Sequence, residues 1–264
     1  MSLHATYLGA NGWLLEFAAG QPDATRVLVD PWLEGPLVFP PGAWLLKGEL
    51  SAPQPVPDGI HLLVLSQGLA DHSHRPSLAL LSRSLPVIAS PAAATVVREL
   101  GFTTITTLKA GERHRHPLSP GGENHFLMVT ATAGASVPQQ ENGYVLDHPA
   151  GRVYLEPHGF VDPDIAATPL DAVITPVVNV ERPLAGALIR GRQALGPLLE
   201  LFQPRTVLAS ATGGDVRFEG LLSRVFRQHG SMDEVRTLIE TGRHPRPCRF
   251  IDPEPGLCYE LDTD

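Results

Sequence analysis

An acidic side chain and an imidazole stand next to each other at Asp71 and His72, shortly after an apolar run that ends at Leu65. We expect this segment to be a loop between a strand and a helix. On such a loop two adjacent side chains can turn into one cleft, whereas neighbours on a regular strand point to opposite faces. Carboxylates and imidazoles bind divalent metal ions and exchange protons near neutral pH. The pair is therefore the first candidate for a chemical centre.

Other candidates for metal binding are weaker. His114 and His116 are separated by one residue, a spacing found in metal sites, but they lie in a charged stretch that we predict to be a solvated turn. The two cysteines, Cys248 and Cys258, have neither zinc-ligand spacing nor the number that a disulfide framework needs. No Gly-x-Ser-x-Gly sequence occurs, which argues against a serine hydrolase with that nucleophile motif.

The elements that position Asp71 and His72 come in two blocks. In the first, short apolar runs between Gly, Pro and Asp predict strands, and helical spacing predicts two helices. The strands are expected at Ala5–Leu8, Trp13–Phe17, Arg26–Val29, Leu62–Leu65 and Pro86–Ala89, and the helices at Arg75–Leu81 and Pro91–Leu100. Ser90 is the expected N-cap of the second helix, with Pro91 at its first position.

The second block repeats this order. Strands are expected at Thr104–Leu108, Phe126–Ala131, Gly143–Asp147, Val153–Leu155, Ala172–Thr175 and Thr206–Ala209. Helices are expected at Ala187–Phe202, at Phe218–Phe226 and from the capping box Ser231–Glu234 to Gly242, and a small hairpin at Arg249–Leu261. Two blocks of strands finished by helices suit two packed sheets with helices outside, but also a doubly wound three-layer αβα domain.

Bulk properties limit the class of protein. A chain of 264 residues with 43% hydrophobic residues can bury a large core, and we expect one compact domain. The formal net charge of −8 argues against nucleic acid or an anionic membrane as a partner. No apolar run approaches the roughly 20 residues that span a bilayer. We therefore expect a soluble, cytoplasmic protein.

Three motifs in order resemble the opening of metallo-β-lactamase superfamily proteins, in particular the lactonase-like branch. They are Tyr7–Glu16 with its Gly-rich turn, Val27–Leu33 with an Asp-Pro after an apolar strand, and Leu63–His72. The resemblance runs from about Ala5 to Ala211. It implies a four-layer αββα sandwich, with residues 1–264 forming one domain and residues 243–264 a C-terminal extension.

The family's metal ligands are only partly kept. Its His-x-His-x-Asp-His motif falls on Gln67–His72, so that Gln67 and Leu69 replace the first two histidines while Asp71 and His72 remain. His158 stands where the family has an Asp that bridges two metals. The family's middle and late histidines are missing from Thr132–Ala135 and from the stretch near Ala209–Thr212. This degenerate motif resembles a variant subgroup with cyanobacterial and plant members.

Carried over in this way, the resemblance implies a single divalent metal bound by Asp71, His72 and His158, with zinc as the first candidate. The chain is then a diverged metal-dependent hydrolase of a small molecule, with Asp71 and Glu156 as catalytic residues. Asn11, Gln67 and His74 are near enough in sequence or motif to assist, although we expect His74 to be a solvated helix residue. The family also implies that Asp30 supports the metal loop.

Two other readings remain open. In the first, the chain keeps the fold but has lost the catalytic activity. It is then a metal-free binding or scaffold protein in which Asp71 caps the following helix. Glu156 then only satisfies backbone donors. In the second, the chain is an oxidoreductase or a nucleotide-binding αβα domain, an interpretation that depends on topology alone. The sequence gives neither the substrate nor the oligomeric state.

Overall fold

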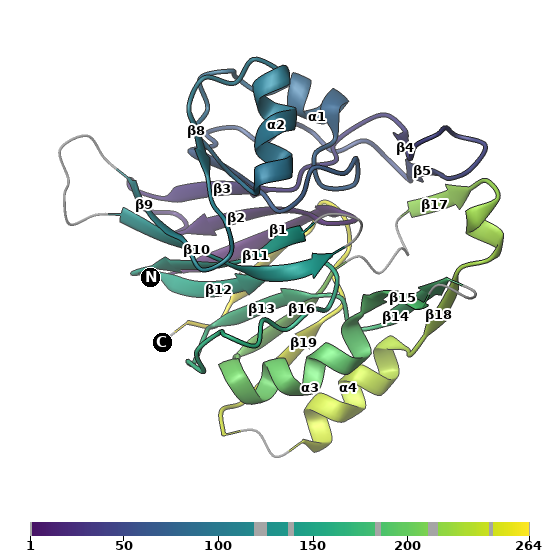
Figure 1. The fold of residues 1–264 in the computed structure, drawn as a ribbon. Coiled ribbons are helices and arrows are strands. Elements are labelled where there is room, and N and C mark those ends of the chain that lie inside the picture. Colours follow the sequence, from purple (N-terminus) through teal and green to yellow (C-terminus); the bar gives the residue numbers. More distant parts are fainter. Residues whose placement is uncertain are drawn as a thin grey trace.

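The computed structural model describes residues 2–118, 126–136, 140–182, 186–210, 216–242 and 245–263. Two large sheets pack face to face, and helices lie on the outer face of each (Figure 1). The helices are α1 (Arg75–Ala79) and α2 (Pro91–Glu99) on the first sheet, and α3 (Gly191–Phe202) and α4 (Met232–Thr241) on the second. The predicted four-layer αββα sandwich is confirmed, and the three-layer αβα alternative is wrong.

The first sheet joins an antiparallel half to a parallel half. In spatial order its strands are β20 (Cys258–Leu261), β1 (Leu3–Gly9), β2 (Gly12–Phe17), β3 (Thr25–Val29), β6 (Leu62–Leu65), β7 (Val87–Ala89) and β8 (Ile105–Thr107). From β20 to β3 the neighbours are antiparallel, and from β3 to β8 they are parallel. Because parallel strands point the same way, the carboxyl ends of β3 and β6 reach the same edge.

The second sheet has the same plan. Its strands are, in spatial order, β19 (Arg249–Ile251), β16 (Thr206–Ala209), β13 (Ala172–Thr175), β12 (Gly151–Leu155), β11 (Gln140–His148), β10 (Phe126–Ser136) and β9 (Arg113–Pro117). Pairing is parallel from β19 to β12 and antiparallel from β12 to β9. His114 and His116 therefore lie on the edge strand β9 rather than in the turn that we predicted.

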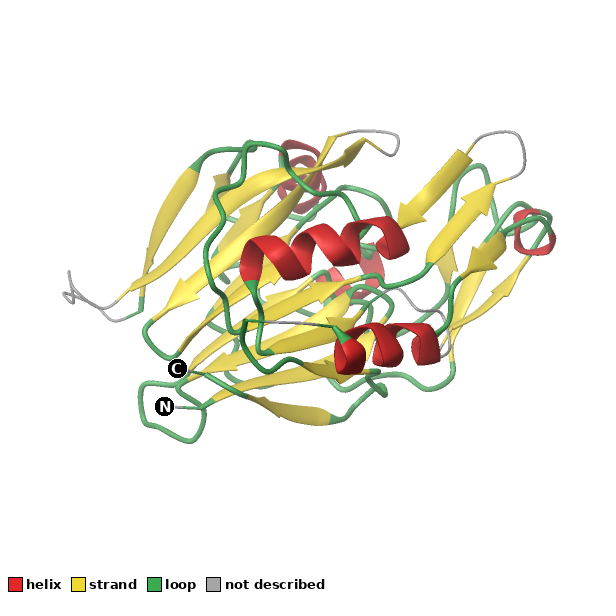
Figure 2. Ribbon diagram, turned by 90° about the horizontal axis from the view of Figure 1, so that it is seen from below, coloured by secondary structure: helices red, strands yellow, loops and turns green. Residues whose placement is uncertain are grey.

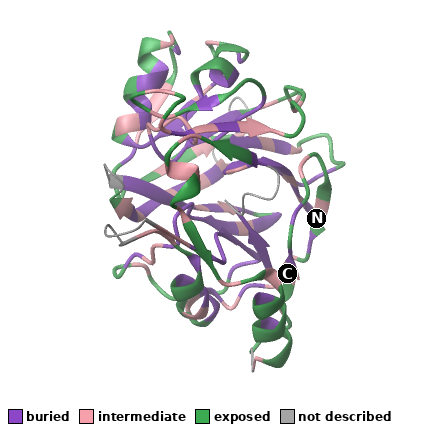
Figure 3. Cartoon of the chain, turned by 90° about the vertical axis from the view of Figure 1, so that its right-hand side faces the viewer, coloured by how far each residue is buried: buried purple, intermediate pink, exposed green. Residues whose placement is uncertain are grey.

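Buried apolar residues form clusters at all three interfaces between the layers, and the buried colour in Figure 3 lies mainly on the strands of the two sheets. The cluster between the sheets includes Tyr7, Trp13 and Phe17 from the first sheet and Leu127 and Tyr144 from the second. A separate cluster lies under α1 and α2, and two more lie under α3 and α4, which cross the second sheet in Figure 2. This burial holds the strand ends, and the loops that leave them, in fixed positions.

The helix caps follow local sequence. The Ser90 side chain accepts a hydrogen bond from the backbone N–H of Ala93, and Ser231 caps α4 through the N–H of Glu234, as predicted. The cap of α1 is His74, which is buried; the expectation that it is solvated is wrong, and so is the alternative that Asp71 caps this helix. None of the helices in the described part of the chain is long and apolar enough to cross a membrane.

Two helix predictions need correction. The segment expected to start a helix at Ala187 begins as strand β15 (Gly186–Arg190), which pairs with β14 (Asn179–Arg182), and α3 starts only at Gly191. A Cβ at Gly191 would lie 2.2 Å from the carbonyl oxygen of Pro176, so the close approach of two backbones fixes this boundary. Gly196 and Pro197 do not divide the helix, which continues to Phe202.

The helix expected at Phe218–Phe226 is absent from the structure. The chain instead forms β17 (Val216–Glu219), the 3₁₀ turn η1 (Leu222–Arg224) and β18 (Arg227–His229). Gly220 has φ +108°, which no α-helix accommodates, and a Cβ there would lie 2.7 Å from the Leu45 carbonyl oxygen. β17 pairs with β5 (Lys47–Leu50), which pairs with β4 (Leu37–Val38) in a small sheet, while β18 pairs with β14.

The C-terminal segment contributes to both large sheets. β19 lies parallel to β16 in the second sheet, and β20 lies antiparallel to β1 in the first. The predicted hairpin at Arg249–Leu261 is therefore wrong. Its two strands pair with different partners, and each forms an edge strand of one large sheet.

Candidate metal centre

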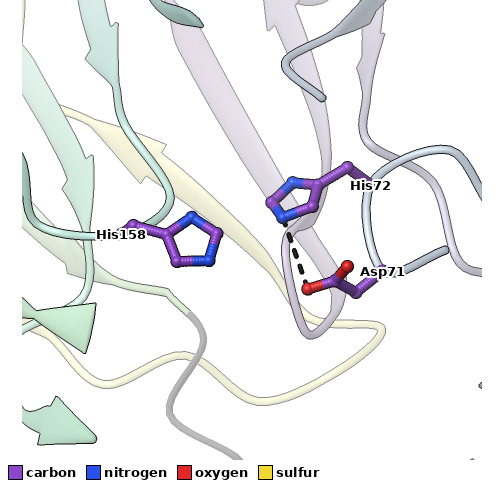
Figure 4. Close-up of side chains that lie close together, drawn as sticks. All are labelled: Asp71, His72 and His158. Carbon is purple, nitrogen blue, oxygen red and sulfur yellow. Dashed lines mark ion pairs between the residues drawn. The ribbon is translucent and has the colours of Figure 1, made fainter. Parts of the chain in front are cut away.

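Asp71, His72 and His158 meet at one edge of the sandwich (Figure 4). Each offers a ligand atom, and these atoms all lie within 4.8 Å of one another. The loop after β6 carries Asp71 and His72, whereas His158 comes from the loop after β12 in the opposite sheet. Both imidazoles are buried and their ring centroids are 5.3 Å apart. The structure thus brings together the three residues that the sequence singled out.

His72 is held by the carboxylate of Asp30, which follows β3. Nδ1 of His72 lies 2.9 Å from Oδ2 of Asp30, and the backbone N–H of Ser66 donates to Oδ1 of Asp30 at 2.8 Å. The Ser66 hydroxyl also donates to this carboxylate. With Nδ1 donating to Asp30, the free position of the imidazole is Nε2, which lies 3.3 Å from Oδ2 of Asp71. The support that the family implies for Asp30 is therefore present in this chain.

His158 is held in the same way by a residue that sequence reasoning missed. Nδ1 of His158 lies 2.8 Å from Oε2 of Glu141, a fully buried carboxylate on β11. The side-chain amide of Gln67 donates to the other oxygen of Glu141 at 3.0 Å. Gln67, which occupies the place of a family ligand, therefore binds the carboxylate that holds His158. Glu141 precedes the strand that we predicted at Gly143, and no local pattern marks it.

Asp71 and the two imidazoles form a coupled electrostatic group. Burial lowers the pKa of His72, but the charges and hydrogen bonds of Asp71 and Asp30 outweigh it and raise the pKa well above 6.5. The pKa of His158 is also raised, because Glu141 outweighs the effect of burial. For Asp71, burial raises the pKa, but His72 and His158 together bring it below its usual value. Without a metal, Asp71 and His72 thus form an ion pair.

Asn11 reaches the same place from the turn between β1 and β2. Its amide nitrogen lies 3.4 Å from Nε2 of His72 and 3.4 Å from the backbone carbonyl oxygen of Asp71. The side chain is buried, and its Oδ1 has no hydrogen-bond partner among the described residues. Asn11 is therefore the polar residue of the first turn that belongs to the site.

Glu156 lies beside the site and binds backbone. Its Oε2 accepts hydrogen bonds from the N–H groups of His158 at 3.1 Å and Phe160 at 2.7 Å, so that it shapes the loop that carries His158. Its Oε1 is buried and has no partner in the part of the chain that the structure describes. Burial is the main cause that raises the pKa of this carboxyl to about 7.

Other candidates lie outside the centre. Nδ1 of His74 forms a hydrogen bond with the hydroxyl of Ser77, and Nε2 forms one with the carbonyl oxygen of Pro36, so both ring nitrogens have protein partners. Leu69 lines a cavity of about 290 Å³ beside α2. Ser210 follows β16 where the family has its late histidine, and Ala211 and Thr212 lie outside the described residues.

The residues present fit a divalent metal ion. Two imidazoles, each with Nδ1 fixed by a carboxylate, leave Nε2 as the ligand atom, and such carboxylate–histidine pairs are typical around bound metals. Asp71 adds a carboxylate whose second oxygen, Oδ1, is buried without a hydrogen-bond partner among the described residues. This donor set of two nitrogens and one oxygen suits zinc and related ions, and it leaves positions for water or a substrate.

Three of the solved structures with a similar fold are described as hydrolases, and two of these as metallo or metal-dependent. An isothiocyanate hydrolase from Delia radicum gut bacteria is 17% identical with a TM-score of 0.66, covering 98% of this chain and 100% of its own. Igni18, a metallo hydrolase from Ignicoccus hospitalis, is 12% identical with a TM-score of 0.66 and covers 100% of both chains. A possible metal-dependent hydrolase from Veillonella parvula is 14% identical with a TM-score of 0.64, covering 98% and 99%. At these identities the likeness shows the fold alone.

No curated protein is similar enough in sequence to count as a relative of this chain. A family model, however, matches most of the chain, from residue 4 to residue 211. That span contains all three residues of the centre and the two carboxylates that hold the imidazoles. The chain therefore belongs to the family described as the beta-lactamase superfamily domain.

Proposed function

We propose that the protein is a metal-dependent hydrolase of a small molecule, with one divalent ion bound by Asp71, His72 and His158. Zinc is the first candidate for this ion. The observation that carries the proposal is the pair of imidazoles from opposite sheets. A buried carboxylate fixes Nδ1 of each, and Asp71 lies within 4.8 Å of both ligand nitrogens. Histidines that bind a metal through one ring nitrogen typically donate the other N–H to a carboxylate, a backbone carbonyl or water in this way.

Asp71, His72 and His158 would hold the divalent ion, which would supply polarisation of a carbonyl or phosphoryl oxygen and a lowered pKa, towards about 7, for a bound water. The protein residues supply the rest. Asp71 has a second carboxylate oxygen with no partner in the described structure, which can orient a water or a substrate hydroxyl. Glu156 has a buried, partner-free Oε1 and a pKa of about 7, which suits a general base at neutral pH. The substrate is a small molecule of unidentified class.

Elemental analysis of protein purified without added metal tests this proposal. We expect close to one equivalent of a divalent metal in the wild-type protein and its loss in His158→Ala. His74→Ala is the matched control, because it removes a nearby buried imidazole whose nitrogens are used by Ser77 and Pro36. It should lower stability and keep the metal. A wild-type protein without stoichiometric metal, before and after incubation with zinc, would contradict the proposal.

One observation favours a metal-free binding protein as the second candidate. Asp71 and His72 compensate each other's charge, so the centre is electrostatically satisfied without an ion. In that case zinc should leave the melting temperature unchanged. A bound ligand should raise it equally in wild-type protein and in Asp71→Ala.

A further inference from the structure

Asn11 is placed at the centre by a strained turn. The turn between β1 and β2 has positive φ at Gly9 (98°) and at Ala10 (48°), and the Asn11 side chain is buried against the loop that carries Asp71 and His72. A non-glycine residue in the left-handed region costs energy, and it persists where the surroundings require it. In this turn the strained backbone brings one amide group to Nε2 of His72.

The two contacts of His72 Nε2 have the spacing of ligands on one ion. Tetrahedral zinc holds nitrogen and oxygen ligands at about 2.0–2.1 Å, which places neighbouring ligand atoms about 3.4 Å apart. Nε2 of His72 lies 3.3 Å from Oδ2 of Asp71 and 3.4 Å from the Asn11 amide. Both separations exceed the 2.7–3.2 Å of ordinary hydrogen bonds, yet both match an edge of a coordination tetrahedron.

The two ends of an amide group exchange places by a half-turn about the terminal torsion. Without an ion, the amide nitrogen is the end of the group that lies 3.4 Å from His72 Nε2. A cation bound to Nε2 attracts the partial negative charge of the amide oxygen and repels the NH₂ group, so the oxygen would face the centre. The rotation gives up the two 3.4 Å contacts of the amide nitrogen, with His72 Nε2 and with the Asp71 carbonyl oxygen, and it uses an oxygen that is now buried without a partner among the described residues.

We propose that Asn11 is a fourth protein ligand of the centre, binding through Oδ1 after its amide rotates. This inference rests on the proposed function, because it needs a metal on Asp71, His72 and His158. A metal held by four strong protein ligands has no open position and is typical of a structural site. Asn11 contributes a neutral amide oxygen, a weaker ligand than a carboxylate, and it is therefore the ligand that a substrate oxygen replaces.

Variants of equal size test the role of the oxygen. Asn11→Leu keeps the shape and removes the oxygen, whereas Asn11→Asp keeps an oxygen at the same place. We expect Asn11→Leu to lower zinc affinity at least about tenfold in competition with a chelator, since even a residue that only supports a ligand costs that much. We expect Asn11→Asp to bind zinc at least as tightly as the wild type. The visible absorption of the cobalt(II)-loaded protein should change in Asn11→Leu.

The outcomes separate this inference from the proposed function. If wild-type protein binds no metal, the proposed function fails, and this inference fails with it. If wild-type protein binds zinc and Asn11→Leu binds it equally tightly with an unchanged cobalt spectrum, only the role of Asn11 is overturned. Thermal unfolding without metal shows whether Asn11→Leu folds; if it does not, Asn11→Ala is compared with Asn11→Asp under the same criteria.

Discussion

Glu141 and His158 are joined by a 2.8 Å hydrogen bond between a fully buried carboxylate on β11 and an imidazole from the loop after β12. The bond fixes Nδ1 of His158 and leaves its Nε2 free to face Asp71 and His72. The same relation joins Asp30 to His72 at 2.9 Å. The centre therefore has two matched halves, each made of one imidazole and the buried carboxylate that fixes it.

Removing the charge of Glu141 should weaken the metal site. Glu141→Gln keeps a hydrogen-bond acceptor for His158 but loses the negative charge that makes the imidazole a stronger ligand, and we expect zinc affinity to fall about 10- to 100-fold. Chelator competition measures this. Glu240→Gln, an exposed change on α4, is the control and should leave zinc affinity unchanged. Equal affinity in wild-type protein and in Glu141→Gln would show that Glu141 does not support a ligand.

Gln67 should act through Glu141. Gln67→Leu leaves one oxygen of a buried carboxylate without its 3.0 Å donor, and an unsatisfied buried group of this kind costs about 1–3 kcal/mol. In Glu141→Gln that penalty shrinks, because the carboxylate is gone. The free energies of unfolding in a double-mutant cycle should therefore be non-additive. Strict additivity would mean that the Gln67–Glu141 contact carries no energy.

The stability of the metal-free protein and its zinc affinity should depend on pH in opposite ways. The pKa values of His72 and His158 are raised by their carboxylate partners. Their contribution to stability is present below the unfolded value of about 6.5 and is lost as the pH rises through the raised folded values. Urea unfolding without metal should show this decline. The pKa of Asp71 is lowered, so its contribution is lost only as the pH falls below about 4.

Zinc must displace the same protons from the imidazoles. Its apparent affinity should therefore rise with pH above 6.5, and binding should release at least one proton. Calorimetry in buffers of different ionisation enthalpy counts the protons. Zinc binding without proton release would contradict the raised pKa of His72.

The sequence predicted those features that depend on neighbouring residues. The caps at Ser90 and Ser231 bind N–H groups three residues ahead, so their partners could be read from the chain. The buried strand Leu62–Leu65 and the loop after it were equally local. The order of the motifs then placed Asp71, His72 and His158 at strand ends that share an edge.

The supporting contacts of the centre could not be predicted in this way. Glu141 and His158 are 17 residues apart, on one strand of the second sheet and after its neighbour, and Asn11 and His72 are 61 apart at one edge of the first, so each contact depends on the order of strands in a sheet and not on neighbouring sequence. The helix expected near Phe218 failed for a similar reason. Its apolar spacing is helical, but the close approach of Gly220 to the Leu45 backbone, set by the pairing of β17 with β5, determines the conformation.

The two roles of Glu156 can be separated by substitution. Glu156→Gln keeps an oxygen for the N–H groups of His158 and Phe160, so we expect a stable protein with wild-type zinc affinity. Glu156→Ala leaves both buried donors unsatisfied and should lower the free energy of unfolding by about 2 kcal/mol or more. Urea unfolding distinguishes these variants.

Activity then decides whether Glu156 is also a base. A base works as the carboxylate, so wild-type turnover of any hydrolysed substrate should rise as the pH passes about 7, where this carboxyl loses its proton. Glu156→Gln cannot take the proton, and we expect it to lower kcat about 100-fold or more and to remove that rise. A Glu156→Gln protein with wild-type kcat would restrict Glu156 to holding the loop of His158. The base would then have to come from the partner-free oxygen of Asp71.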